Sequence, residues 1–302
     1  MIYTITFNPS IDYVVYTDNV LKGEINRAKE EEVYPGGKGI NVSIMLKNLG
    51  FESIALGFKA GFVGDEIENM LNKLNCKNEF IKLKSGFSRI NIKVCEQNEE
   101  TAINGEGPLI TESDIKKLLS ALNCITSEDF VVLSGSIPKS LPQDTYAKII
   151  KNFSNAKPKF IVDTTGKNLL NILKYKPFLI KPNHFELGEI FNKNLTDNKE
   201  IIFYAKKLQD MGAKNVLVSL AEKGAILVDE NNKIHILNAP KGTLINSVGA
   251  GDSMVAGFIA GYIEFSNYEK ALKKAVSAGS ASAFQKWLAK KSDVEKIMTT
   301  FF

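Results

Sequence analysis

The residues with the clearest chemical potential lie in the stretch 246–258, Asn-Ser-Val-Gly-Ala-Gly-Asp-Ser-Met-Val-Ala-Gly-Phe. Gly249 and Gly251 flank Ala250 and stand just before an apolar run with helical character. A helix that starts there leaves its first backbone N–H groups without partners, and its dipole favours an anion at that end. Glycines let the backbone approach the anion without a Cβ in the way. The stretch therefore predicts an anion hole formed by Gly249, Ala250 and Gly251.

Asp252 follows in the first turn of the same predicted helix. A second negative charge beside a bound anion is useful when the carboxylate takes a proton from a hydroxyl group that attacks the anion. This arrangement predicts phosphoryl transfer, with Asp252 as the base. The alternative for this stretch alone is a glycine-rich helix entry that Asp252 caps, because short glycine motifs recur by chance.

A second glycine-rich stretch, Gly36-Gly37-Lys38-Gly39, precedes a helix predicted over 40–49. It is not a Walker A loop, since Gly39 stands where Ser or Thr is required after the lysine. Glycines, a lysine and a helix N-terminus still make a second site that suits an anion. The alternative is a flexible turn with a solvated lysine.

The elements that must position these residues alternate between strands and helices. Buried strands are predicted over 130–133, 160–163, 178–180 and 215–219, with helices over 146–153, 201–211, 252–264 and 268–284. A hairpin is predicted over 225–237. This alternation is typical of a doubly wound α/β domain with a mostly parallel sheet.

Several early segments do not fit that rhythm. The segment 89–95 alternates Ile90, Ile92 and Val94 with polar residues, and 100–104 is its predicted partner across a turn near Gln97-Asn98. Alternation of this kind predicts a half-exposed strand. Together with 13–16 and 27–34, these strands predict a small separate sheet that is inserted in pieces.

Composition excludes several classes of protein. The chain has 302 residues, 44% of them hydrophobic, and a formal net charge of +4, which is too mild to indicate nucleic acid binding. Cys76, Cys95 and Cys124 lie far apart and form no CxxC pair, so neither a disulfide framework nor a zinc site is expected. No secretory signal and no membrane-spanning run is visible, and we expect a cytoplasmic protein.

The motifs together resemble a known family. GGKGIN at 36–41 and NSVGAGDS at 246–253 resemble the two signatures of the ribokinase-type (PfkB) carbohydrate kinase family. Three shorter motifs match in order and spacing: Asn8-Pro9-Ser10-Ile11-Asp12, Lys181-Pro182-Asn183 with Glu186, and Ser219 with Lys223-Gly224. The resemblance covers nearly the whole chain. It implies a single ribokinase-like domain over 1–302, with a discontinuous β lid from about 12–16, 27–35 and 88–104.

The resemblance also implies roles for residues at the sugar end. Contacts to the sugar or its phosphate are implied for Asp12, Gly37, Lys38, Asn41, Arg89 and Asn91. Arg89 can bind a phosphate bidentately, although on the sequence alone it is also a solvated charge on an alternating strand.

A second group of residues is implied to serve the nucleotide ATP. These are Asn183, Glu186, Ser219, Lys223, Gly224, Gly249, Gly251 and Ser280. Asn183 and Glu186 are implied to organise Mg²⁺ and phosphates, largely through water, and Asn183 can cap a helix at the same time. Small side chains over 278–283 either wall the adenine or pack two helices.

Within the family, the chain resembles the phosphofructokinase branch. This implies transfer of the γ-phosphoryl group of ATP to the 6-hydroxyl of fructose 1-phosphate, in a homodimer that pairs through the lid. The alternatives are tagatose 6-phosphate or another hexose phosphate as substrate and, from a different class, a sugar-phosphate sensor without catalysis. One departure from the family pattern is Gln285-Lys286-Trp287, which is bulkier than the glycine-containing stretch expected there.

Overall fold

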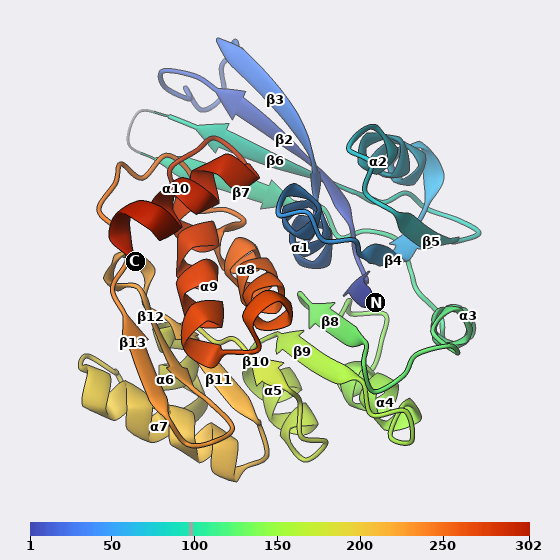
Figure 1. The fold of residues 1–302 in the computed structure, drawn as a ribbon. Coiled ribbons are helices and arrows are strands. Elements are labelled where there is room, and N and C mark those ends of the chain that lie inside the picture. The colour runs from blue at the N-terminus through green and yellow to red at the C-terminus, as the bar shows by residue number, and fades with distance from the viewer. Residues whose placement is uncertain (97–98) are drawn as a thin grey trace.

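The computed structural model describes residues 1–96 and 99–302. The turn expected at Gln97-Asn98 lies outside these residues. The described strands form two sheets, one of nine strands in the order β13-β12-β11-β10-β9-β8-β1-β4-β5 and one of four in the order β3-β2-β6-β7 (Figure 1). None of the helices described is long and apolar enough to cross a membrane.

The large sheet is mostly parallel, as the alternation of strands and helices predicts. Its strands in chain order are β1 (Ile2–Thr6), β4 (Ile54–Lys59), β5 (Asn78–Lys82), β8 (Phe130–Ser134), β9 (Lys159–Asp163), β10 (Leu179–Ile180), β11 (Asn215–Ser219), β12 (Ala225–Val228) and β13 (Ile234–Leu237). Only β12 and β13 pair antiparallel with their neighbours. The sequence reasoning missed β5, an edge strand whose residues are at most half-buried and show no apolar alternation.

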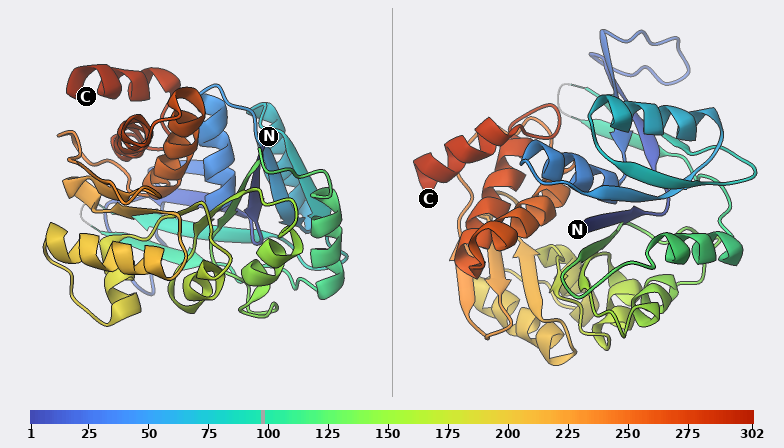
Figure 2. Two further views of the ribbon diagram at one scale, coloured as in Figure 1. Left: turned by 60° about the horizontal axis from the view of Figure 1, so that its bottom comes forward. Right: turned by 45° about the vertical axis from the view of Figure 1, so that its right-hand side comes forward.

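Helices cover both faces of this sheet. One face carries α1 (Lys38–Asn48), α8 (Ala250–Phe265), α9 (Tyr268–Ala283) and α10 (Lys291–Phe301). The other carries α3 (Glu112–Ala121), α4 (Thr145–Asn152), α5 (Gly166–Leu173), α6 (His184–Phe191) and α7 (Asn198–Asp210). The left view of Figure 2 shows the sheet between the red and orange helices and the yellow and green ones. Each face has its own apolar cluster, so the core is double-sided.

Two helices of the first face approach each other closely. A Cβ on Gly257 of α8 would lie 2.6 Å from the carbonyl oxygen of Lys274 and 2.8 Å from the Cβ of Ala278, both on α9. Glycine is therefore required for this contact. Small residues in this part of α9 thus pack helices, one of the two roles left open by the sequence.

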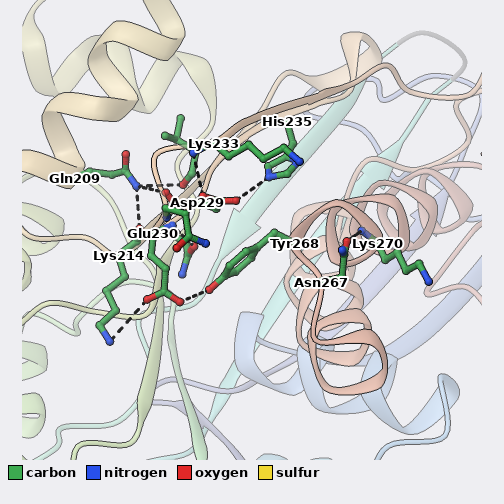
Figure 3. A network of polar contacts seen from close by, with 12 residues as sticks. Gln209, Lys214, Asp229, Glu230, Lys233, His235, Asn267, Tyr268 and Lys270 are labelled. Carbon is green, nitrogen blue, oxygen red and sulfur yellow. Dashed lines mark hydrogen bonds and ion pairs between the residues drawn. The ribbon is translucent and has the colours of Figure 1, made fainter.

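The antiparallel hairpin at one edge of the large sheet is fastened by polar contacts (Figure 3). The carboxylate of Asp229 lies 2.8 Å from the His235 ring and accepts backbone N–H groups of Asn231 and Lys233 at 2.9 and 3.0 Å. The Gln209 side chain donates to the carbonyl oxygen of Asp229 at 2.8 Å, and the Tyr268 hydroxyl donates to Glu230. These contacts join the hairpin to α7 and α9.

The small sheet, called the lid sheet below, contains β2 (Ser10–Tyr16), β3 (Glu30–Gly36), β6 (Arg89–Cys95) and β7 (Glu100–Asn104). It is a separate sheet, as the alternating segments predict, and β6 and β7 pair antiparallel. Strand β3 begins at Glu30 rather than at 27. The hairpin between β2 and β3 projects beyond the body, as the right view of Figure 2 shows. Near its base the sheet packs on α2 (Gly61–Lys73).

Candidate active site

A cavity of about 510 Å³ lies where the lid sheet faces the carboxyl ends of the central strands. Thr6, Ser134 and Asp163 end β1, β8 and β9 there, and Lys181 follows β10. In parallel α/β sheets ligands bind at this edge, outside the carboxyl ends of the strands. All six residues predicted for the sugar end line the cavity: Asp12, Gly37, Lys38, Asn41, Arg89 and Asn91.

The start of α8 forms the floor of the cavity. Gly249 precedes the helix with φ of +79°, a conformation that suits glycine. Gly249, Gly251 and Asp252 line the cavity, while Ala250 is the first helical residue. A Cβ on Gly251 would lie 3.3 Å from the Lys181 Nζ, so an ammonium group stands beside the free N–H groups. Backbone donors and a cation together suit a phosphoryl group.

Asp252 is buried at this helix start, with 6% of its surface exposed. Burial raises the pKa of its carboxyl from 3.8 to about 6, and the Asp163 carboxylate adds to the rise. Lys38, a hydrogen bond from Asn41 and Lys181 act in the opposite direction. The Asn41 Nδ2 donates to the Asp252 Oδ2 at 2.8 Å, which fixes the orientation of the carboxyl. A pKa near 6 leaves Asp252 ionised at neutral pH and able to accept a proton.

Two lysines share one buried carboxylate next to Asp252. The Nζ of Lys38 lies 3.2 Å and that of Lys181 3.4 Å from the oxygens of Asp163. Burial alone would raise the pKa of Asp163, but the two ammonium groups outweigh it and lower the pKa. Burial alone would lower the pKa of Lys38, which the carboxylates of Asp163 and Asp252 raise instead. Asp163 and Lys38 therefore stay charged inside the cavity.

The lid sheet supplies the opposite wall. Asp12 on β2 accepts hydrogen bonds from Ser10 at 2.8 Å and Asn91 at 2.9 Å, and it pairs with Lys93 at 3.1 Å. The register sets this cluster, because Asp12 stands opposite Asn91 in the parallel pair β2–β6. Side chains two residues apart on a strand share a face, so Arg89, Asn91 and Lys93 all point into the cavity.

Arg89 differs from the other cations of the cavity. Its Nε donates to the carbonyl oxygen of Asn8 at 3.1 Å. In the described parts of the chain it forms no ion pair, whereas Lys38, Lys93 and Lys181 each pair with a carboxylate. Its terminal nitrogens are thus the cationic donors with the least competition for an incoming anion.

The predicted nucleotide residues other than Gly249 and Gly251 lie outside this cavity. Asn183 caps α6, and it bridges Ser219 at the end of β11. Lys223 and Gly224 belong to the short turn after β11, and Ser280 lies half-buried on α9. Packing also requires a glycine at position 224, since a Cβ there would lie 2.0 Å from the carbonyl oxygen of Leu237.

Comparison with known proteins decides the family. The sequence profile of the pfkB family carbohydrate kinases matches residues 5–292. The chain belongs to the pfkB carbohydrate kinase family. A curated relative, the 1-phosphofructokinase of Bacillus subtilis, is 45% identical over 298 residues, which cover 99% of this chain and 97% of the relative. The D-tagatose-1-phosphate kinase of Bacillus licheniformis is 39% identical over 301 residues, with coverages of 99% and 97%.

A solved structure has the same fold. Phosphofructokinase-2 from Escherichia coli in complex with fructose-6-phosphate superposes with a TM-score of 0.91 at 28% identity, covering 99% of this chain and 98% of that one. The expected ribokinase-like architecture, a mostly parallel sheet flanked by helices with a small separate sheet, is therefore confirmed.

Within this pfkB kinase, sequence reasoning missed some polar residues of the cavity. Asp163 was not singled out, and Lys181 was noted only as part of the Lys181-Pro182-Asn183 motif, without a role. Asp163 ends a buried strand and Lys181 follows one, so both had to reach the ligand edge of the sheet. Lys93 could have been found by continuing the polar side of β6 beyond Asn91. The buried hydroxyl oxygens of Thr6 and Ser134 find no hydrogen-bond partner among the described residues, and both line the cavity, which makes them available to a ligand.

Asn183 and Glu186, the residues predicted to organise Mg²⁺, offer only a few side-chain oxygens to a metal ion. In a capping box the amide oxygen of Asn183 accepts the backbone N–H of Glu186, and one carboxylate oxygen of Glu186 accepts the backbone N–H of Asn183, both at 2.8 Å. Among the residues described, no group of three or more His, Cys, Asp or Glu side chains could hold a metal ion. Mg²⁺ keeps several waters and binds substrate phosphates, so the two residues fit an ion held mainly by the nucleotide and water.

Proposed function

We propose that this protein transfers the γ-phosphoryl group of ATP to the 6-hydroxyl of fructose 1-phosphate, giving fructose 1,6-bisphosphate and ADP. The name of the Bacillus subtilis relative supports this substrate. The observation that carries the proposal is the position of Asp252, a buried carboxyl with a pKa near 6 at the N-terminus of α8. It shares one cavity with the unpaired guanidinium of Arg89.

The chain's own groups divide the work. The sugar hydroxyls meet Asp12, Asn41 and Asn91, and the 1-phosphate meets Arg89 with help from Lys38 and Gly37. The 6-hydroxyl gives its proton to Asp252 as it attacks phosphorus. The N–H groups of residues 249–251 and the ammonium of Lys181 bind the oxygens of the transferred group. Positioned donors of this kind stabilise charge that is spread over the phosphoryl oxygens.

The nucleotide side follows the family assignment. The ATP is bordered by Asn183, Glu186, Ser219, Lys223, Gly224, Gly249, Gly251 and Ser280. Bound Mg²⁺ would neutralise charge on the nucleotide phosphates, and Asn183 and Glu186 would hold it through water. The carboxylate of Glu186 contributes to the raised pKa of Lys38, so it acts electrostatically on a residue of the sugar end.

Two other functions make different predictions. A tagatose phosphate is the alternative substrate, which the name of the Bacillus licheniformis relative supports. The different-class alternative is a sugar-phosphate sensor without catalysis. A sensor has no use for a base, so the buried Asp252 with its raised pKa favours an enzyme.

The lid sheet offers a surface for assembly. On the face away from the cavity, a row of side chains crosses the four strands: Val33, Tyr13, Ile92 and Ile103. The side chains of Ile92 and Ile103 are 39% and 61% exposed. An exposed apolar sheet face is typical of an interaction surface. We therefore propose a cytoplasmic homodimer that pairs through the lid sheets, each chain being one kinase domain with its discontinuous lid.

The deciding experiment is an ADP-release assay with a panel of free sugars and sugar phosphates. Fructose 1-phosphate should give the highest kcat/KM. A higher value for tagatose 6-phosphate or tagatose 1-phosphate would replace the substrate but keep the reaction. Absence of ADP release across the panel, with sugar phosphates still bound, would favour the sensor.

A further inference from the structure

The loop 284–290, between α9 and α10, contacts the lid sheet. Its Lys286 Nζ lies 2.7 Å from the Glu30 carboxylate and 3.4 Å from that of Glu32, both on β3. The same ammonium group stands 5.2 Å from the ring centre of Tyr16 on β2. Tyr16 in turn donates its hydroxyl to Glu32 at 2.9 Å. One lysine thus joins two strands of the lid sheet to the body.

An aromatic stack lies beside this ion pair. Trp287 and Tyr34 have ring centres 4.8 Å apart and ring planes 15° apart. Tyr34 on β3 stands opposite Asp12 in the antiparallel pair β2–β3, so the stacked ring lies next to the strand that carries the proposed sugar-binding carboxylate. Beyond Tyr34 the strand runs through Gly36 into α1, whose first residue is Lys38.

The other side of the same loop contacts the anion hole. The side-chain amide of Asn246 donates to the carbonyl oxygen of Lys286 at 2.8 Å, while its oxygen accepts the N–H of Val248 at 2.8 Å. Leu288 packs so closely on Gly249 that a Cβ there would lie 2.8 Å from its methyl group. The loop is therefore in direct contact with both the lid sheet and the residues that precede α8.

We propose that Lys286 and Trp287 are positioning residues that latch the lid sheet to the anion hole and so couple sugar-phosphate binding to nucleotide binding. This inference rests on the proposed function for the identity of the ligands. The chain enters β2 at Ser10 and leaves β3 at Gly36, so these two strands join the body at the same end. Lys286 contacts Tyr16 and Glu30 at the opposite ends of β2 and β3, so the latch contacts hold the end of the two strands that lies away from these links.

The first test needs no ligand. Trp287 is the only tryptophan, so fluorescence reports the latch directly. Lys286→Met should expose Trp287 to acrylamide and raise its quenching constant, because an ion pair of this kind shifts an equilibrium by roughly one-and-a-half- to fivefold. Tyr34→Leu should do the same through the lost stack. Lys291→Met is the matched control, since Lys291 forms a similarly exposed pair with Glu295 at 3.6 Å.

The second test is kinetic. With both substrates varied, wild type should show that ATP lowers the KM for fructose 1-phosphate. Lys286→Met should weaken this coupling by up to about fivefold, the range of a surface ion pair, and leave kcat nearly unchanged. Lys286→Arg should restore it. Quenching and coupling equal to those of Lys291→Met would overturn the latch. No turnover of fructose 1-phosphate by wild type would instead refute the proposed function, and the ligand-free quenching would still decide the latch.

Discussion

Asp252→Asn should remove activity and at the same time stabilise the fold. The asparagine keeps an oxygen that can accept the hydrogen bond from Asn41, but it cannot take a proton. Loss of a general base typically lowers the rate by about 10²–10⁴-fold. The folded variant no longer carries a buried charge at position 252. A pKa of about 6 in place of 3.8 corresponds to on the order of 3 kcal/mol at neutral pH.

The size of the stabilisation depends on pH. In the folded state Asp252 keeps its proton up to about pH 6, whereas in the unfolded chain it loses the proton near pH 4. The unfolded state therefore binds fewer protons between these values, and the contribution of Asp252 to stability falls as the pH rises. The stability gap between variant and wild type should grow from about 0.5 kcal/mol at pH 4 to about 3 kcal/mol at pH 7, and then stay constant.

Thermal unfolding at pH 4, 5, 6 and 7 measures this gap, and the ADP-release assay measures the activity. Asp210→Asn, at the exposed C-terminal end of α7, is the matched control for the same substitution outside the cavity. The reasoning would be refuted by a variant that is less stable than wild type at pH 7. It would equally be refuted by a variant that keeps more than roughly a third of kcat, well above the range for a lost base.

Three further predictions concern the lid sheet. Arg89→Ala should raise the KM for fructose 1-phosphate by roughly thirty- to several-thousand-fold and leave the KM for ATP nearly unchanged, because it removes one partner of the buried charge pair between Arg89 and the substrate phosphate. Comparable kcat/KM values for fructose and fructose 1-phosphate would contradict this pairing. Gly36→Ala should weaken sugar binding in the same assay, because the new Cβ would lie 2.5 Å from the Asp12 carboxylate; an unchanged KM would show that the sheet adjusts. Ile92→Asp should convert a dimer of 33.4 kDa chains into monomers by light scattering, and an active wild-type monomer would exclude this assembly.

The residues that could be predicted from the sequence belong to local motifs. Lys38 and Asn41 were assigned to the sugar end through the GGKGIN motif, and a helix places residues three positions apart on one face, so both line the cavity. Asp252 followed from the glycines before α8. The alternation along β6 predicted the side of the sheet that carries Arg89 and Asn91.

What could not be predicted depends on contacts between distant segments. The sharing of Asp163 by Lys38 and Lys181 depends on the order of strands in the large sheet, which no local pattern contains. The raised pKa of Asp252 likewise depends on burial and on the nearby Asp163 carboxylate, and no local pattern in the sequence brings these together. The bulk of Trp287 was visible as a departure from the family, but its stack on Tyr34 needed the lid sheet in position.

The contact between Asn41 and Asp252 has a consequence for how the protein is made. Its two residues are 211 positions apart, so a chain leaving the ribosome has the sugar half of the site long before the base. Contacts between distant segments form late and slowly in folding. A ligand that needs both halves can stabilise only molecules that have completed α8. Substrate in the cell would thus protect finished chains from proteolysis while leaving truncated ones exposed.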